Sequence, residues 1–147
     1  MIKGGEMNID LEHIREHFKK DRFATGIGVV INSITEDSVV CSMELNEDHK
    51  NSVGGVQGGA IFTLADLAFA VHCNLEWVCG EDVGVTVGQS CSISYLKSTR
   101  GNCLTATSTC ISKGRTMSVY RICVEDDLGM PIAEMLANGF TTKKSDT

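Results

Sequence analysis

A helix-like stretch that is apolar on nearly every side constrains this chain more than any other feature. Residues 60–71, AIFTLADLAFAV, contain two polar side chains, those of Thr63 and Asp66. A helix with apolar residues all around its surface is normally buried on most sides. Other elements must therefore wrap around it, and 147 residues are enough to provide them within one domain. We expect a single domain, residues 1–147, built around this helix.

The flanking segments predict one further helix and six strands. The spacing of Leu11, Ile14 and Phe18 predicts a short amphipathic helix capped by Asp10, within an N-terminal helical segment at 1–24. Because the strands are grouped apart from the helices, we expect the α+β class, with a sheet around the central helix, a first hairpin and a final four-stranded meander. The expected strands are 27–34, 39–45, 83–96, 103–112, 116–125 and 131–141, with a flexible tail at 142–147.

Composition excludes several classes of function. The formal net charge is −6 and Lys and Arg do not cluster, which argues against nucleic acid binding. The amino terminus has no apolar signal region, and no apolar run approaches the roughly 20 residues that span a membrane. The seven cysteines form no CxxC pair and several lie in apolar runs, so we expect reduced thiols and a cytoplasmic protein, with disulfides as the alternative. No zinc-ligand spacing is present, so we expect no metal.

A glycine-rich loop, GGVQGG at 54–59, directly precedes the apolar helix. The N–H groups near Gly58 and Gly59 are then helix-start donors without intrahelical acceptors, and they can hold an oxyanion. Glycine also lets a ligand approach the backbone closely. A tight turn before a packed helix, without a ligand, is the alternative reading of the same spacing.

Asp66 lies too far into the helix to cap it, and an ionised carboxylate in an apolar setting is costly unless it is paired or solvated. Its functional interpretation is a general base or nucleophile, and its structural alternative is a side chain that reaches solvent. Asp66 follows Gly58 by eight positions, which at 1.5 Å per residue is about 12 Å along the helix axis. If both groups act on one carbonyl, they must come from two copies of the chain that face each other.

These residues resemble a known signature. HKNSVGGVQGGAIFTLADLAFAVHCN at 49–74 is similar to that of hot-dog-fold acyl-CoA thioesterases of the phenylacetyl-CoA thioesterase type, which has Asn, then His-Gly-Gly, then Leu-Ala-Asp at this spacing. The resemblance extends over residues 25–141. It implies a curved antiparallel sheet around the long helix, a homodimer of two sheets, often a homotetramer, and acyl-CoA as substrate without a metal or redox cofactor.

Residue by residue, the resemblance implies a catalytic set. Asn51 and the Gly58 N–H polarise the thioester carbonyl, and Asp66 of the facing subunit activates water or attacks directly. Gln57 stands where the family usually has histidine, so it can donate a hydrogen bond but cannot take up a proton near neutral pH. Some members carry a water-positioning Ser or Thr at the position of Gly88.

Other residues are candidates for contacts with the substrate, each with a structural alternative. Gly59 permits close approach, Thr63 shares a helix face with Asp66 or bonds its own backbone, and Ser90 is a substitute for the hydroxyl missing at Gly88. Turn residues that can meet coenzyme A phosphates, or simply be solvated, are Lys113 and Arg115, with Lys97 and Arg100. His49 can reach the pocket mouth or be solvated, and His72 is expected to be structural.

The sequence thus predicts an enzyme that hydrolyses an acyl-CoA thioester to a carboxylate and free coenzyme A. A hot-dog protein that binds or senses acyl-CoA without turnover is the main alternative, favoured by Gln57 and Gly88 and opposed by Asn51, Gly58 and Asp66. A dehydratase on the same fold requires a histidine beside a carboxylate, and the expected histidine position is Gln57.

Overall fold

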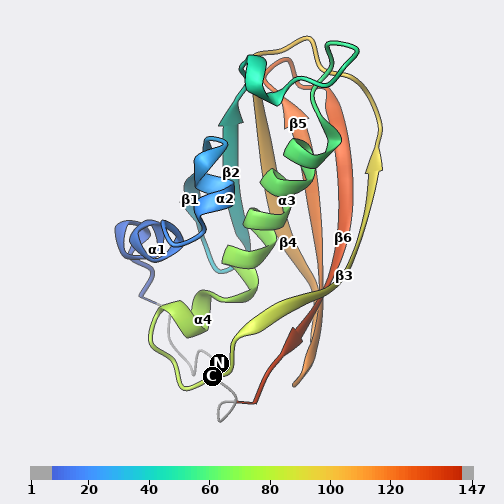
Figure 1. Cartoon of the computed structure of the whole chain (residues 1–147). Helices are drawn as coiled ribbons and strands as arrows, with labels where there is room; N and C mark the ends of the chain where they lie inside the picture. The colour runs from blue at the N-terminus through green and yellow to red at the C-terminus, as the bar shows by residue number, and fades with distance from the viewer. Residues whose placement is uncertain (1–7, 144–147) are drawn as a thin grey trace.

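The computed structural model describes residues 8–143, and its central feature is a six-stranded antiparallel sheet curved around one long helix (Figure 1). The sheet order is β1-β2-β4-β5-β6-β3. This arrangement confirms the α+β class and the sheet wrapped around a helix. The strands are β1 (Val29–Ile34), β2 (Ser38–Glu44), β3 (Thr86–Tyr95), β4 (Cys103–Lys113), β5 (Met117–Asp126) and β6 (Pro131–Thr141).

The apolar stretch forms α3 (Gly58–Cys73), which crosses the concave face of the sheet (Figure 1). Its buried side chains meet buried side chains of the strands in one hydrophobic core. Because most of its surface packs against other elements, tertiary burial stabilises this helix more than intrinsic propensity does. The buried residues of α3 are Ile61, Leu64, Ala65, Leu67, Ala68, Phe69, Val71 and His72.

The predicted four-stranded meander is wrong in one strand. β4, β5 and β6 pair in sequence, but β3 pairs with β6 and not with β4. The reason is that β4 already pairs with β2 along one side and with β5 along the other. β3 lies instead beside β6, where it is an edge strand whose second side is unpaired within the described residues.

The N-terminal segment forms two short helices, α1 (Leu11–Phe18) and α2 (Arg22–Gly26), instead of one. Asp10 caps α1 as predicted, since its side chain accepts hydrogen bonds from the Glu12 and His13 N–H groups. Residues 1–7 of the predicted helical segment lie outside the described residues. The remaining helices are η1 (Glu47–His49) before the glycine-rich loop and α4 (Leu75–Val78) after α3.

The predicted tail begins with an anchored residue. The Thr142 N–H donates to the Val85 carbonyl at 2.9 Å, and its hydroxyl donates to the same oxygen at 3.1 Å. Residues 144–147 of the predicted tail are outside the described part of the chain. None of the helices within residues 8–143 is long and apolar enough to cross a bilayer.

Gly84→Ala is expected to destabilise the fold, because a Cβ atom at this position would overlap the backbone carbonyl of Thr142. The backbone must shift, and overpacking of this kind costs about 1–3 kcal/mol in the free energy of unfolding. Urea denaturation measures that loss. Gly26→Ala is the matched control, since a Cβ there meets nothing within 4 Å. Equal stability of the two variants would contradict the close packing of Gly84 on Thr142.

Candidate active site

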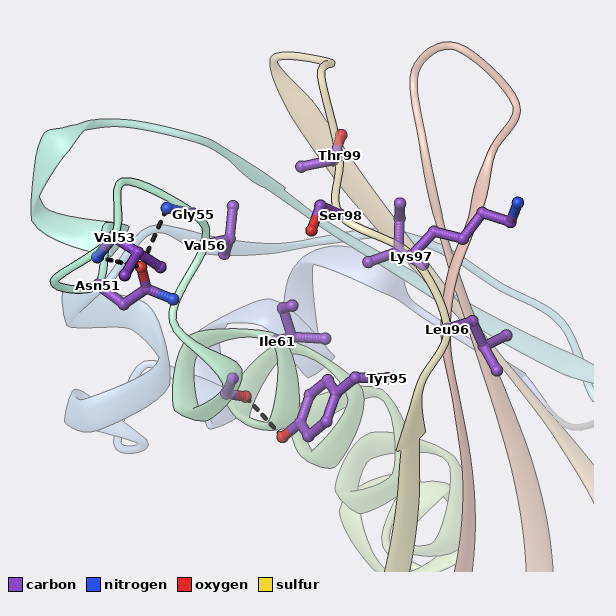
Figure 2. Close-up of a pocket in the computed structure, with 12 residues that line it drawn as sticks. Asn51, Val53, Gly55, Val56, Ile61, Tyr95, Leu96, Lys97, Ser98 and Thr99 are labelled. Atoms are coloured by element: carbon purple, nitrogen blue, oxygen red, sulfur yellow. Dashed lines mark hydrogen bonds between the residues drawn. The ribbon is translucent and has the colours of Figure 1, made fainter.

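An open cavity of about 470 Å³ lies at the start of α3, between the 51–56 loop and the end of β3 (Figure 2). Two segments far apart in the sequence form its walls, and Ile61 of α3 and Ile132 of β6 add apolar surface. The cavity therefore brings the predicted donors together with a wall that the sequence interpretation did not foresee. The loop residues are Asn51, Val53, Gly55, Val56 and Gly58, and the opposite wall is Tyr95, Leu96, Lys97, Ser98 and Thr99.

The Asn51 side chain is fixed by its own loop. Its Oδ1 atom accepts hydrogen bonds from the Val53 and Gly55 N–H groups, both at 3.0 Å (Figure 2). The loop turns at Gly54, whose φ of 84° favours glycine. Because the amide oxygen is engaged, the Nδ2 group is the end that remains to donate, and within residues 8–143 no acceptor is assigned to it. Asn51 thus presents a hydrogen-bond donor at the cavity.

The backbone at the start of α3 supplies further donors. The Gln57 N–H donates to the His49 carbonyl at 2.7 Å, and the Gln57 carbonyl accepts from Ala60 and Ile61. The next two N–H groups, those of Gly58 and Gly59, have no acceptor in the described part of the chain. The positive end of the helix dipole lies here, so these groups favour a negatively charged oxygen.

Gln57 itself is exposed, and its side chain makes no capping hydrogen bond to α3. The carboxamide is therefore not held by the helix start. The structure gives Gln57 a backbone role as the N-cap of α3, while its predicted catalytic role remains a prediction.

Tyr95 is the residue of this cavity that sequence reasoning missed. It is the last residue of β3, and its hydroxyl donates to the Gly58 carbonyl at 2.9 Å (Figure 2). A Cβ atom on Gly58 would lie 3.1 Å from Cζ of the tyrosine ring, so the ring rests directly on the glycine backbone. Glycine at position 58 thus permits both ligand approach and tyrosine packing.

The basic residues divide between the two ends of α3. Lys97 lines the cavity with Asn51 and Gly58. Lys113 is the last residue of β4 and Arg115 lies in the turn between β4 and β5, at the opposite end of the sheet from the start of α3 (Figure 1). There they border a second hollow, and the Lys113 ammonium pairs with Glu76 at 2.9 Å. Within one subunit, the structure therefore separates Lys113 and Arg115 from the predicted oxyanion donors.

Asp66 lies in the middle of α3, on the side that the rest of the chain covers least. Beyond the first turn, the partly exposed positions of this helix are Phe62, Thr63, Asp66, Ala70 and Cys73, three or four residues apart. They form one stripe, which we call the open face of α3. Asp66 is absent from the lining of the Asn51 cavity, as expected for a group about 12 Å along the axis from Gly58.

The environment of the Asp66 carboxylate is unfavourable for charge. Partial burial raises its pKa above the ordinary aspartate value, and the carboxylate of Asp21 at the start of α2 raises it further. Within residues 8–143 no hydrogen-bond donor or cation pairs with it. β3 packs against α3, and burial and then the Asp66 carboxylate raise the pKa of Cys91 on β3. A half-buried, unpaired carboxylate with a raised pKa suits proton transfer.

The two predicted hydroxyl contacts already have partners. The Thr63 hydroxyl donates to the Gly59 carbonyl at 2.8 Å, which is the structural alternative expected for a helical threonine. The Ser90 hydroxyl on β3 accepts from the Asn138 amide at 2.8 Å. Each oxygen can still accept a further bond, so their contacts with the substrate remain predictions. At Gly88, an added Cβ would lie 3.4 Å from the Phe69 ring.

Two histidines, His49 and His72, are buried and hydrogen-bonded within the fold. His49 is buried, contrary to the expectation of a solvated or pocket-mouth residue: Nδ1 accepts from the Asn46 N–H at 3.1 Å, and Nε2 lies 2.6 Å from the Ile27 carbonyl. That pattern fits a neutral imidazole with the proton on Nε2. His72 is buried against Tyr120, 3.1 Å from the Ser108 hydroxyl, in agreement with its expected structural role. In the described residues no group of His, Cys, Asp and Glu side chains is arranged to hold a metal ion.

Comparison with known proteins agrees with this geometry. Residues 18–135 match the family described as "Domain of unknown function (DUF4442)". The acyl-coenzyme A thioesterase PaaI of Escherichia coli (strain K12) is 31% identical over 106 residues, which are 71% of this chain and 71% of that protein. The solved structure of the E. coli PaaI protein, from the phenylacetic acid degradation operon, has a TM-score of 0.78 at 26% identity and covers 90% of this chain and 96% of its own.

A protein from Streptococcus mutans UA159, solved with acetyl CoA bound, has a TM-score of 0.69 at 26% identity and covers 79% of this chain and 90% of its own. A six-stranded antiparallel sheet curved around one long helix is the architecture of the hot-dog fold class. The chain matches the DUF4442 family and belongs to the hot-dog acyl-CoA thioesterase superfamily, which confirms the family predicted from residues 49–74.

Proposed function

We propose that this protein hydrolyses acyl-CoA thioesters to a carboxylate and free coenzyme A. Its family places it among thioester hydrolases. The observation that carries the proposal is that two donors with no acceptor among residues 8–143, the Asn51 Nδ2 group and the Gly58 N–H, belong to residues that line one cavity. Thioester hydrolysis passes through a tetrahedral oxyanion, and donors aimed at the developing charge lower its energy.

The second half of the site comes from the partner subunit in this proposal. Asp66 lies about 12 Å along α3 from Gly58, too far for both to contact one thioester carbon. α3 and β3 pack against each other, and the side of β3 that faces away from β6 is unpaired within the described residues. In this proposal the open face of α3 and that edge of β3 belong to one interface. A homodimer formed along this side covers both and brings Asp66 of each chain to the other's cavity. A homotetramer of two such dimers is the further assembly proposed.

Asp66 acts on the thioester as a general base that activates water, or as a nucleophile that attacks the carbonyl carbon. Either role uses the ionised carboxylate, and both fit a carboxylate that carries no competing hydrogen bond within the described residues. In the first role Asp66 takes a proton from water. In the second it forms an anhydride that water then cleaves, with the coenzyme A thiolate leaving in both.

The coenzyme A moiety is the part of the substrate that basic residues recognise in this proposal. The acetyl CoA complex of the S. mutans relative supports a coenzyme A ligand. Lys97 is the basic residue of the Asn51 cavity, whereas Lys113 and Arg115 approach the same substrate from the partner chain, at the far end of its α3. Gly59, Thr63 and Ser90 are proposed to line the path of the substrate. No metal or redox cofactor is required, and the seven free thiols support a cytoplasmic protein.

Binding of acyl-CoA without turnover is the second candidate, favoured by Gln57, whose side chain makes no hydrogen bond to the helix start. The deciding experiment measures thiol release from a panel of aliphatic and aromatic acyl-CoA esters. We expect thiol release with at least one ester. Gln57→His is assayed alongside the wild type, and the difference in kcat measures what the family's histidine adds. Tight binding of the panel, by calorimetry, with no thiol release would contradict hydrolysis and support a sensor.

A further inference from the structure

Resting on the proposed function, we propose that Tyr95 is a positioning residue: it holds the Gly58–Gly59 peptide so that the Gly59 N–H is a third donor, and a second backbone donor, to the thioester oxyanion. The proposed site so far has the Gly58 N–H and the Asn51 amide as its donors. Tyr95 adds the Gly59 N–H to these donors, because its hydroxyl contacts the Gly58 carbonyl oxygen.

The contact is made to one end of a single peptide group. The hydroxyl of Tyr95 donates to the Gly58 carbonyl oxygen at 2.9 Å. That carbonyl and the Gly59 N–H belong to the same planar unit, so fixing one end fixes the direction of the other. A hydrogen bond accepted by the carbonyl also polarises the unit and makes its N–H a stronger donor. Tyr95 thus orients and strengthens the Gly59 N–H without touching the substrate.

The neighbouring peptide group is supported in the same way, by the helix. The Gly58 N–H shares its peptide with the Gln57 carbonyl, which accepts from the Ala60 N–H at 2.9 Å and from the Ile61 N–H at 3.2 Å. Both free donors at the start of α3 are therefore supported at the carbonyl end of their peptides. One of these supports is the Tyr95 side chain, which comes from β3, 37 residues away in the sequence. Water could serve the Gly58 carbonyl equally well if this peptide needed no fixed direction.

The packing of Tyr95 points to the same role. Its side chain is 51% exposed, so burial in the core does not explain its position. Its ring nevertheless lies on Gly58 closely enough that a Cβ atom would come within 3.1 Å of Cζ and 3.2 Å of the hydroxyl oxygen. The backbone of Tyr95 is anchored by pairing with Ala133 of β6. The tyrosine therefore bridges the sheet and the helix start at the wall of the cavity.

Tyr95→Phe tests the inference, because it keeps the ring on Gly58 and removes only the hydroxyl. We expect kcat for the best acyl-CoA ester to fall about tenfold, less than for loss of a donor itself, with KM and the melting temperature unchanged. The chain has two tyrosines, and Tyr120→Phe is the matched control. Tyr120 is buried against Phe69 and His72, away from the cavity, so its kcat and KM are expected to equal those of the wild type.

Three outcomes would overturn the inference. A wild-type kcat in Tyr95→Phe means that the hydroxyl positions nothing. A rise in KM at constant kcat means that the hydroxyl binds the substrate and does not act through Gly59. Absence of turnover in the wild-type protein removes the proposed function and this inference together, whereas the first two results leave hydrolysis intact.

Discussion

Replacing Asp66 by asparagine is expected to lower kcat for acyl-CoA hydrolysis by about a thousandfold, within the range that general base catalysis contributes. Asparagine has nearly the same shape, but it can neither take a proton from water nor attack the thioester. KM is expected to change little, because the donors at Asn51 and Gly58 are intact. Thiol release under steady-state conditions measures both constants, and a kcat equal to that of the wild type would exclude a catalytic role for Asp66.

The same variant has an expected effect on stability that runs in the opposite direction. Burial raises the pKa of Asp66 in the folded state, so the folded protein holds this proton more tightly than the unfolded chain does. The associated stability is present below the unfolded pKa and is lost as the pH rises through the folded pKa. Asp66→Asn is therefore expected to melt at a higher temperature than the wild type at neutral pH, and this gain disappears in acid.

The pH profile of kcat/KM tests whether the Asp21 carboxylate contributes to the raised pKa of Asp66. Activity is expected to fall as the pH falls through the raised pKa of Asp66, because the ionised form is the reactive one. Asp21→Asn keeps a capping oxygen for α2, whose Ala24 N–H donates to Asp21 at 3.0 Å, but removes the charge that acts on Asp66. The acidic limb should then move to lower pH. An unchanged limb would contradict the contribution of Asp21 and leave burial as the cause of the raised pKa.

Two inactive variants are expected to regain activity when they assemble together. Asn51→Asp keeps the oxygen that holds Val53 and Gly55 but replaces the amide donor by a carboxylate, which repels the oxyanion. In a heterodimer of Asn51→Asp with Asp66→Asn, one site carries both changes and the other carries neither. Random assembly of equal amounts makes half the dimers mixed, so about a quarter of wild-type kcat per site is expected on co-expression.

The reciprocal mixture is the control for this experiment. When the double variant Asn51→Asp/Asp66→Asn assembles with the wild type, every mixed dimer has one change in each site and is inactive. About a quarter of wild-type activity is then expected, against about half if each site lay within one chain. No recovery in the mixture of the two single variants, together with half activity in the control, would refute a shared site and leave the two residues in separate roles.

The fold was predictable where one local pattern has one structural solution. An all-apolar run around Asp66 can only be a buried helix, and alternation bounded by turn residues identified every strand near its observed position. The pairing of β3 with β6 was not predictable in this way. Strand order depends on which edges are already occupied, and β4 is occupied by β2 through contacts between residues more than 50 positions apart. Periodicity carries no information about such contacts.

The residues of the candidate site show the same difference between local patterns, which the sequence reveals, and long-range contacts, which it does not. Asn51, Gly58 and Asp66 were candidates because their spacing is itself the signal; the structure brings Asn51 and Gly58 to one cavity, and the roles of all three remain predictions. His49 was misjudged because its neighbours are charged, although Asn46 three residues earlier is a capping pattern that could have indicated its role. Tyr95 gave no signal, since an exposed aromatic residue at a strand end looks the same with or without a partner 37 residues away.

The loop that carries Asn51 closes on itself through bonds to Val53 and Gly55, and its geometry needs neither ligand nor second chain. The amide donor is consequently preorganised: its conformational entropy is lost when the chain folds and not when the thioester binds. In the proposed mechanism, assembly then has one task left, which is to bring Asp66 of the partner subunit to the thioester. Each subunit alone supplies the oxyanion donors in this proposal, and donors and carboxylate meet only in the proposed dimer.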